Sequence, residues 1–343
     1  MNRHLISVKV SVVSSTLDSF SMPPRLLIAF DDSEAANAAV RAAAGLFPGA
    51  SGRVLTVFPR PIDYETARQY SFAVDDATLR RGLEALARQA ADAALDTARR
   101  GCRLAASAGL ELEPAAASGG ISDWPAFLSA ADDIPADAIV CGSRGRGAMA
   151  RSLLGSTSTS LVHHATRPVL VVPRMPRSID GPAIIGYDGS REAQVAIERA
   201  GRLMQGRSAI VTYVWRSPIL HDFSGQALAH APVRDVREIV DGYEAIFAGG
   251  ADDVVEEGVA RARAAGFEAS GDAVESGSGP WHALADVAER RGAAVIVCGS
   301  RGRGGVASAV LGSVSSGLVH NADIPTLLVR GGEAGAQRPG INR

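Results

Sequence analysis

Apolar residues along this chain fall into two patterns, short continuous runs and longer stretches with helical spacing. Continuous runs are typical of strands buried on both faces, and helical spacing predicts amphipathic α-helices between them. In the first half, the expected strands cover residues 25–30, 53–58, 112–117, 137–142 and 168–173. The expected helices cover 33–47 with Ser33 as N-cap, about 75–108, the stretch after Trp124, and 156–164. This alternation predicts a parallel sheet covered by helices on both faces.

The second half of the chain repeats the first. The nine residues IVCGSRGRG occupy 139–147 and return at 296–304, 157 positions later, and the same offset relates the first and last strands of each half. Two copies of one domain explain this register. We therefore expect an α/β protein made of two tandem Rossmann-like domains, each with a five-stranded parallel sheet. The expected bounds are 22–173 and 183–330, with a linker at 174–182 and disordered ends at 1–21 and 331–343.

The composition and net charge limit the classes of protein to which this chain can belong. Of 343 residues, 46% are hydrophobic and 21% are charged, and the formal net charge is −2. That balance gives no electrostatic case for binding nucleic acid or an anionic membrane surface. No apolar run reaches the length of a membrane span, and Lys9 interrupts the N-terminal apolar stretch, which makes it a poor signal peptide. A cytoplasmic protein is expected.

Cysteine and histidine give little sign of a metal or catalytic site. The three cysteines are too few and too scattered for a disulfide framework or a zinc cluster. Cys141 and Cys298 fall on predicted buried strands, where a small apolar core residue is the expected role. His163 and His320 are equivalent in the two repeats and fall in the last turn of a predicted helix, where a positive ring suits the helix dipole. We expect no metal ligands among the histidines.

A glycine-rich loop follows the fourth strand of each repeat and leads into a helix. Glycine lets the backbone adopt positive φ and lets a ligand approach without a Cβ, and the helix N-terminus offers unpaired N–H groups to a phosphate. Ser156 and Ser313 are placed to cap that helix and to hydrogen-bond a phosphate oxygen, and the loop arginines would add counter-charge. The loop residues are Gly142, Arg144, Gly145, Arg146, Gly155 and Ser156 in the first repeat, and Gly299, Arg301, Gly302, Arg303, Gly312 and Ser313 in the second.

This loop also has purely structural explanations. Glycine-rich strand-to-helix loops occur without ligands, Ser156 can be no more than an N-cap, and loop arginines are usually solvated. For one repeat alone the two interpretations are balanced. A loop with only a structural role is free to change its glycine spacing between the repeats. Because the glycine spacing is identical in both repeats, phosphate binding is favoured.

Two other nucleotide-binding motifs are not supported. A weak dinucleotide fingerprint, Gly145-x-Gly147-x-x-Ala150, follows the fourth strand and not the first, and no acidic residue stands about 20 positions later in the manner of dehydrogenases. The sequence contains no G-x4-GK[ST] of the P-loop type. Dehydrogenases and P-loop ATPases are therefore disfavoured.

The glycine motif resembles that of a known family. The pattern G-x2-G-x9-G-[ST], between a strand and a helix that leads to a PVLVV-type strand, is similar to the ATP-binding motif of the universal stress protein family. Residues 137–174 resemble that family's C-terminal signature along their whole length, and the first-strand aspartates in AFDDSE and GYDGSR also match. The resemblance covers about 25–330. It is specific at the signature and ordinary in the long Arg/Ala helices.

Carried over by position, the resemblance implies one ATP site in each repeat, with Mg²⁺ able to accompany the phosphates. Asp31 and Asp188 would lie beside the nucleoside, and Val57 and Val214 would line the adenine pocket. The glycine loops would wrap the ribose and the phosphates. A carboxylate accepts hydrogen bonds from sugar hydroxyls or an amine, and apolar side chains can sandwich a base, so the residue types suit these roles.

The two sites are expected to be unequal. Where the first repeat has Asp32, the second has Gly189, and the extra carboxylate would either repel phosphate or face solvent. Where the first repeat has Thr157, the second has Val314, which removes one hydroxyl from the phosphate region.

The favoured function is that of an ATP-binding regulatory protein of the stress response with little or no turnover. Fast ATP hydrolysis needs a water-positioning base and metal ligands beyond a phosphate cradle. The repeats share no candidate base near the loop except Asp31 and Asp188, to which the resemblance gives a binding role. Two alternatives stay open, namely a stress scaffold or adaptor that binds no nucleotide and a slow ATPase.

The last strand of each repeat indicates how the two domains could associate. PVLVVP at 168–173 and TLLVR at 326–330 are apolar edge candidates, and an exposed edge of this kind invites pairing. The resemblance implies that these two strands pair across a pseudo-two-fold axis within the chain. It also implies a homodimer of chains.

Overall fold

The computed structural model describes residues 22–60, 62–71, 74–145, 154–216, 233–302 and 311–331, with side chains throughout except at 233–248. The strands are β1 (Arg25–Ala29), β2 (Ser51–Phe58), β3 (Glu113–Ser118), β4 (Ala138–Gly142), β5 (Val169–Val172), β6 (Ala183–Gly186), β7 (Ser208–Trp215), β8 (Glu268–Glu275), β9 (Val295–Gly299) and β10 (Thr326–Val329). The helices are α1 (Glu34–Leu46), α2 (Tyr64–Tyr70), α3 (Asp76–Ser107), α4 (Trp124–Asp133), α5 (Ser156–His164), α6 (Arg191–Leu203), α9 (Val233–Ala264), α10 (Pro280–Arg290) and α11 (Ser313–Asn321).

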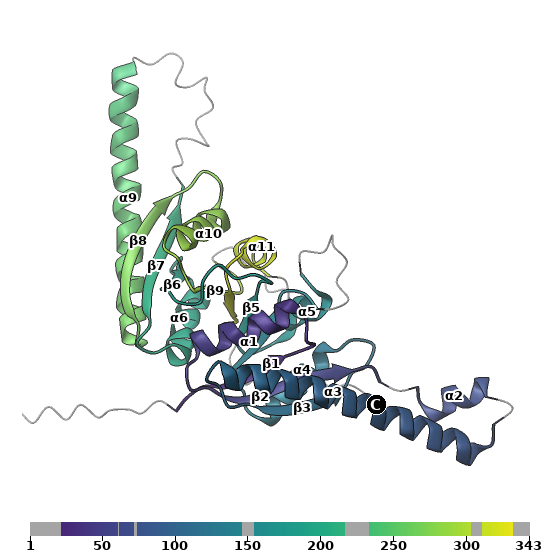
Figure 1. Cartoon of the computed structure of the whole chain (residues 1–343). Helices are drawn as coiled ribbons and strands as arrows, with labels where there is room; N and C mark the ends of the chain where they lie inside the picture. The colour runs from purple at the N-terminus through teal and green to yellow at the C-terminus, as the bar shows by residue number, and fades with distance from the viewer. Residues whose placement is uncertain are drawn as a thin grey trace, which may run out of the picture.

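All these strands belong to one sheet, in the order β3-β2-β1-β4-β5-β10-β9-β6-β7-β8 (Figure 1). Within each repeat the neighbouring strands are parallel, as the continuous apolar runs predict. The two halves of the sheet join where β5 and β10 pair antiparallel, with Leu170 opposite Leu327. The predicted α/β fold and the predicted pairing of the last strands are therefore confirmed. Each last strand is covered by the other, so β3 and β8 are the outermost strands.

Helices cover both faces of the sheet and enclose two cores. Successive strand residues point to opposite faces. Ile28 accordingly packs on the side of α1, α3, α6 and α9, while Leu27 packs on the side of α4, α5, α10 and α11. Both residues are fully buried, and each core runs across both repeats.

Short polar residues before the helices fix where several of them begin. The Ser33 hydroxyl accepts a hydrogen bond from the Ala36 N–H at 3.2 Å, which confirms the predicted N-cap of α1, and Ser190 caps α6 in the same way through Ala193. Asp75 caps α3 by accepting from the Thr78 N–H at 2.9 Å. The short helix α2 was not predicted, because its seven residues are too few to show helical periodicity.

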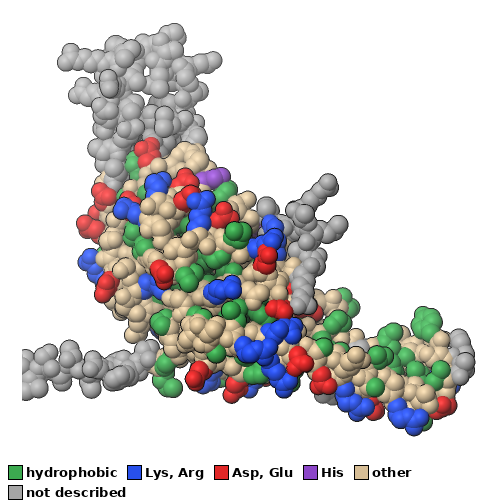
Figure 2. All heavy atoms as spheres, in the orientation of Figure 1, with side chains coloured by type: hydrophobic (Ala, Val, Ile, Leu, Met, Phe, Trp, Pro, Cys, Tyr) green, Lys and Arg blue, Asp and Glu red, His purple; other side chains and the backbone are tan. Residues whose placement is uncertain are grey.

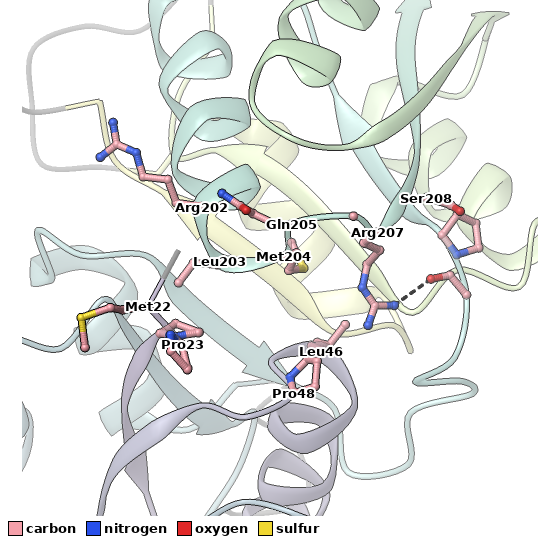
Figure 3. A pocket seen from close by; sticks show the side chains of 14 residues that line it. Met22, Pro23, Leu46, Pro48, Arg202, Leu203, Met204, Gln205, Arg207 and Ser208 are labelled. Atoms are coloured by element: carbon pink, nitrogen blue, oxygen red, sulfur yellow. Dashed lines mark hydrogen bonds between the residues drawn. The ribbon is translucent and has the colours of Figure 1, made fainter. Parts of the chain in front are cut away.

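The two repeats also meet at the amino ends of their strands, around a pocket of about 730 Å³ (Figure 3). Arg207, at the turn before β7, crosses this junction. Its guanidinium donates to the carbonyl of Gly181 at 2.9 Å and to the carbonyl of Gly45 in the last turn of α1 at 2.6 Å. Burial lowers the pKa of Arg207, and nearby Asp180 acts in the opposite sense. Arg207 thus links the second repeat to both the linker and the first repeat.

Replacing Arg207 with alanine is expected to lower the free energy of unfolding by about 2 kcal/mol, because two part-buried carbonyls lose a charged donor. The measurement is urea unfolding followed by circular dichroism. Arg202→Ala is the matched control, since Arg202 lines the same pocket but is exposed, and its change is expected within about 0.5 kcal/mol. Equal losses in the two variants would contradict a linking role for Arg207.

Candidate functional site

The candidate site of each repeat lies at the carboxyl ends of the strands, where the glycine loop leaves β4 or β9. Two backbone hydrogen bonds hold the ends of the first loop together. Ser143 N–H donates to the Val172 carbonyl and Gly155 N–H donates to the Ser143 carbonyl, both at 2.7 Å. The equivalent bonds of the second repeat, each 2.8 Å, are Ser300 N–H to Val329 O and Gly312 N–H to Ser300 O. The N-terminus of the following helix is thereby brought back beside the end of the strand.

An aspartate from the neighbouring strand packs against the second glycine of each loop. Because β1 pairs with β4, and β6 with β9, the second residue after the first strand of each repeat lies beside this loop. A Cβ at Gly145 would lie 2.6 Å from Asp31 Oδ2, and a Cβ at Gly302 would lie 2.6 Å from Asp188 Oδ2. Any other residue at either position would require the aspartate carboxylate to move.

The other oxygen of each of these carboxylates has a backbone partner. Asp31 Oδ1 accepts from the Ser33 N–H at 3.1 Å, and Asp188 Oδ1 accepts from the Ser190 N–H at 3.0 Å. These bonds orient the carboxylates identically in the two repeats. Oδ2 is then the oxygen directed at the glycine loop.

Packing against a neighbouring helix explains why the first residue of each loop is glycine. A Cβ at Gly142 would lie 2.6 Å from the Ala35 carbonyl carbon, and a Cβ at Gly299 would lie 3.0 Å from Glu192 Cβ. Both contacts come from the first turn of the helix that follows the aspartate. The structural interpretation of the loop therefore accounts for these two glycines without any ligand.

The predicted capping role of Ser156 and Ser313 is wrong. The N-cap residues are Gly155 and Gly312, whose backbones are extended, and no side chain caps α5 or α11. Each serine stands one position later, in the first helical turn, where its side chain cannot reach the N–H groups that an N-cap serves. Ser156 and Ser313 are exposed at the helix N-terminus beside the loop.

The remaining predicted residues border the same region. Val57 and Val214 lie near the carboxyl ends of β2 and β7 and are half-buried, as are Thr157, Val314 and Arg144. Arg146 and Arg303 lie outside the described residues. The loop residues and the two valines thus lie on the same carboxyl side of the sheet.

The second repeat holds buried polar atoms beside its loop. Arg301 Nε and Ser300 Oγ are buried and make no hydrogen bond within the described part of the chain. Arg330, directly after β10, is partly buried, and its pKa is lowered by burial and then by the charge of Arg301. Two arginines thus lie close together at this site. Ser300 and Arg330 were missed in the sequence, although Ser143 and Ser300 stand at the same position of the repeated motif.

The extra carboxylate of the first repeat, Asp32, is partly exposed and has an arginine partner within the chain, which was not predicted. Asp32 has a positive φ of 65° and Gly189 one of 76°, so both take the same left-handed turn. The Asp32 carboxylate pairs with Arg100 of α3, with Oδ2 and Nε 2.8 Å apart. Glu257 occupies the position of Arg100 in the second repeat and pairs instead with Arg261 at 2.9 Å.

The two strand cysteines are core residues, as expected. Cys141 and Cys298 are buried, and burial raises the pKa of each thiol to about 12. His164, for which no role was predicted, stacks on Trp124 with ring centroids 4.3 Å apart. The described residues contain no group of three or more His, Cys, Asp or Glu side chains placed to hold a metal ion. They also contain no helix long and apolar enough to span a membrane.

Comparison with known proteins gives consistent matches. The model of the universal stress protein family matches residues 22–173 and 182–330. Universal stress protein Rv1996 of Mycobacterium tuberculosis is 33% identical over 202 residues, which cover 56% of this chain and 58% of that protein. The chain thus spans less than two thirds of that relative's length.

One solved structure supports the fold. A universal stress protein from Archaeoglobus fulgidus matches with a TM-score of 0.54 and 18% identity, over 90% of this chain and 98% of that one. Another Archaeoglobus fulgidus structure, of a universal stress protein in complex with dAMP, matches with a TM-score of 0.28 and 21% identity, over 44% of this chain and 99% of that one. The first of these likenesses extends across both repeats.

Proposed function

The chain belongs to the universal stress protein family, and from this premise we propose that each repeat binds one adenine nucleotide, with ATP as the ligand. The protein would then be a nucleotide-binding regulator of the stress response, acting in the cytoplasm. Little or no turnover is part of the proposal.

The observation that carries the proposal is the close approach of an aspartate to a loop glycine in both repeats, where an added Cβ would lie 2.6 Å from the carboxylate Oδ2. A carboxylate oriented by a backbone N–H is an acceptor for hydroxyl or amine donors, which a ribose or an adenine supplies. The absence of a Cβ at Gly145 and Gly302 leaves this carboxylate accessible from the loop. The geometry thus suits a nucleoside lying between the first strand and the glycine loop.

The helix N-termini support the placement of phosphates. No side chain caps α5 or α11, so their first N–H groups point towards the region where Ser156 and Ser313 are exposed. Unpaired N–H groups and the helix dipole favour an anion at such a position. In the second repeat, the buried Arg301 Nε and Ser300 Oγ would gain acceptors from a phosphate. Mg²⁺ would enter with the phosphates.

The proposal of slow turnover rests on the roles of the carboxylates. Asp31 and Asp188 each use one oxygen to hold the turn at the start of the following helix and direct the other at the loop. A base that activates water must face the γ-phosphate, and the proposed binding pose gives these carboxylates to the nucleoside.

The direct test is to purify the protein without added nucleotide, denature it by heat, and identify the released molecules by chromatography. We expect ATP at close to two molecules per chain. One molecule per chain would indicate that a single repeat is occupied. If nothing is released and none binds when ATP and magnesium are added, the nucleotide proposal fails and a scaffold or adaptor role is favoured. ADP that accumulates on incubation with ATP and magnesium would indicate a slow ATPase.

A further inference from the structure

The helix α3 is much longer than the sheet that it covers. Its buried residues all lie in its C-terminal part: Ala94, Thr97, Ala98, Gly101 and Ala105. Because α3 starts at the carboxyl end of the sheet and runs back along it, its N-terminal half extends past that edge (Figure 1). We call the projecting part, residues 62–71 and 74–93, the arm.

Large apolar side chains are exposed along this arm. The exposed fractions are 56% for Ile62, 79% for Tyr70, 38% for Val74 and 61% for Leu86. Figure 2 shows green side chains gathered over the same part of the molecule. Elsewhere in the described chain, large apolar residues with comparable exposure occur one at a time. A cluster of this kind on a projecting element marks an interaction surface.

The apolar positions of the arm helix have the spacing of a coiled-coil seam. They advance by steps of four, three, four and three: Leu79, Leu83, Leu86, Ala90 and Ala93. This is the alternation of the a and d positions of a heptad, which lets one helix pack along another. The short helix α2 packs on the first turns of α3 through Arg68–Asp76 and Arg80–Tyr64 contacts, and Leu86 remains exposed beyond it.

The second repeat keeps the same apolar register in α9. Positions 157 residues later in the sequence are Val236, Val240, Tyr243 and Phe247, opposite Leu79, Leu83, Leu86 and Ala90 of the first repeat. The two long helices project from the body in different directions, so neither covers the other within one chain (Figure 1).

The charges of the arm favour a protein partner of the same kind. The arm holds four arginines and six acidic residues, with both signs interspersed. A membrane-surface helix would carry an excess of Lys and Arg on its polar face, and a nucleic-acid surface would be basic. Because both signs are interspersed along the arm, its arginines can lie opposite the acidic residues of a second copy.

We propose that the arm is the surface through which this chain binds a second copy of itself, with the Leu79–Leu83–Leu86 seam of α3 packed against a long helix of that copy. The bodies of the two chains would then be joined at the carboxyl edges of their sheets. This contact is separate from the β5–β10 pairing within each chain.

The test is sedimentation equilibrium of the full chain over a concentration series. We expect the wild-type chain to dimerise, and Leu83→Glu combined with Leu86→Glu to raise the dimer dissociation constant at least about tenfold by placing charges in the seam. The matched control is Ala77→Glu combined with Ala85→Glu, which adds the same charges at exposed positions off the seam and is expected to dimerise normally.

Circular dichroism and nucleotide release are measured on all three proteins. Native helix content shows that each variant folds, and unchanged nucleotide release separates this proposal from the proposed function. A wild-type chain that stays monomeric at every concentration overturns the proposal, whether or not the arm binds lipid vesicles. Equal dimerisation of the seam variant and the control overturns it as well.

Discussion

Replacing Asp31 with alanine is expected to remove one of the two nucleotides bound by the chain, and replacing Asp188 is expected to remove the other. Each substitution deletes the carboxylate that faces the glycine loop. Its Oδ2 lies 2.6 Å from the position that a Cβ added at the loop glycine would occupy. A lost charged hydrogen bond of about 1.5–3 kcal/mol weakens binding by roughly 10- to 150-fold. Calorimetric titration with ATP and magnesium measures the affinity and number of sites.

Asp32→Gly is the matched control for Asp31→Ala. It removes the neighbouring carboxylate, which pairs with Arg100, and it installs the residue that the second repeat has at Gly189. Glycine suits the left-handed φ of 65° at this position, so the turn should survive. We expect both nucleotides to bind to this variant. Normal binding by Asp31→Ala, or loss of a site in Asp32→Gly, would contradict the assigned role of Asp31.

Replacing Gly258 with leucine is expected to lower the free energy of unfolding by about 3 kcal/mol, near the upper end for overpacking a core. A Cβ at Gly258 would lie 2.7 Å from both Tyr187 Cδ1 and Val211 Cγ1. Gly101 holds the equivalent place in α3, where a Cβ would lie 2.7 Å from Val54 Cγ1. The long helices thus pack on the sheet through a glycine, and Gly101→Leu is expected to behave in the same way.

Gly249→Leu supplies the control in the same helix, because nothing lies within 4 Å of a Cβ there. Leucine favours the helix over glycine by about 0.8–1 kcal/mol, so this variant should be slightly more stable than the wild type. Urea unfolding followed by circular dichroism compares the two. A loss of stability at Gly249, or none at Gly258, would show that close packing is not what selects glycine.

Much of the fold was predictable because the apolar runs are continuous and each element occurs twice in the sequence. Apolar runs such as that of β4 are read directly as buried parallel strands, and the 157-residue register doubles the evidence for each element. The N-cap Ser33 followed from a local rule of side-chain and backbone geometry. The pairing of β5 with β10 came from family resemblance, because strand spacing alone does not specify a partner.

The details of the site were less predictable, for physical reasons. The helix start at Ser156 was predicted, but the N-cap is Gly155 and not the serine, a difference of one residue that sequence rules do not resolve. The Asp32–Arg100 pair joins residues 68 positions apart, so the sequence alone could not reveal where the carboxylate points. The approach of Asp31 to Gly145 depends on the parallel pairing of β1 with β4 and was not predicted.

The pairing of β5 with β10 can form only after the second repeat has been translated. The strand β5 ends at Val172 and its partner β10 begins only at Thr326, so 153 residues must be translated between them. At about 5–20 residues per second, the ribosome needs roughly 8–30 s to deliver that partner. Throughout this interval the finished first repeat presents an apolar strand edge, and so does every nascent chain on neighbouring ribosomes. The rate at which the second half is translated therefore governs how often two unfinished chains can join through β5 before each closes on itself.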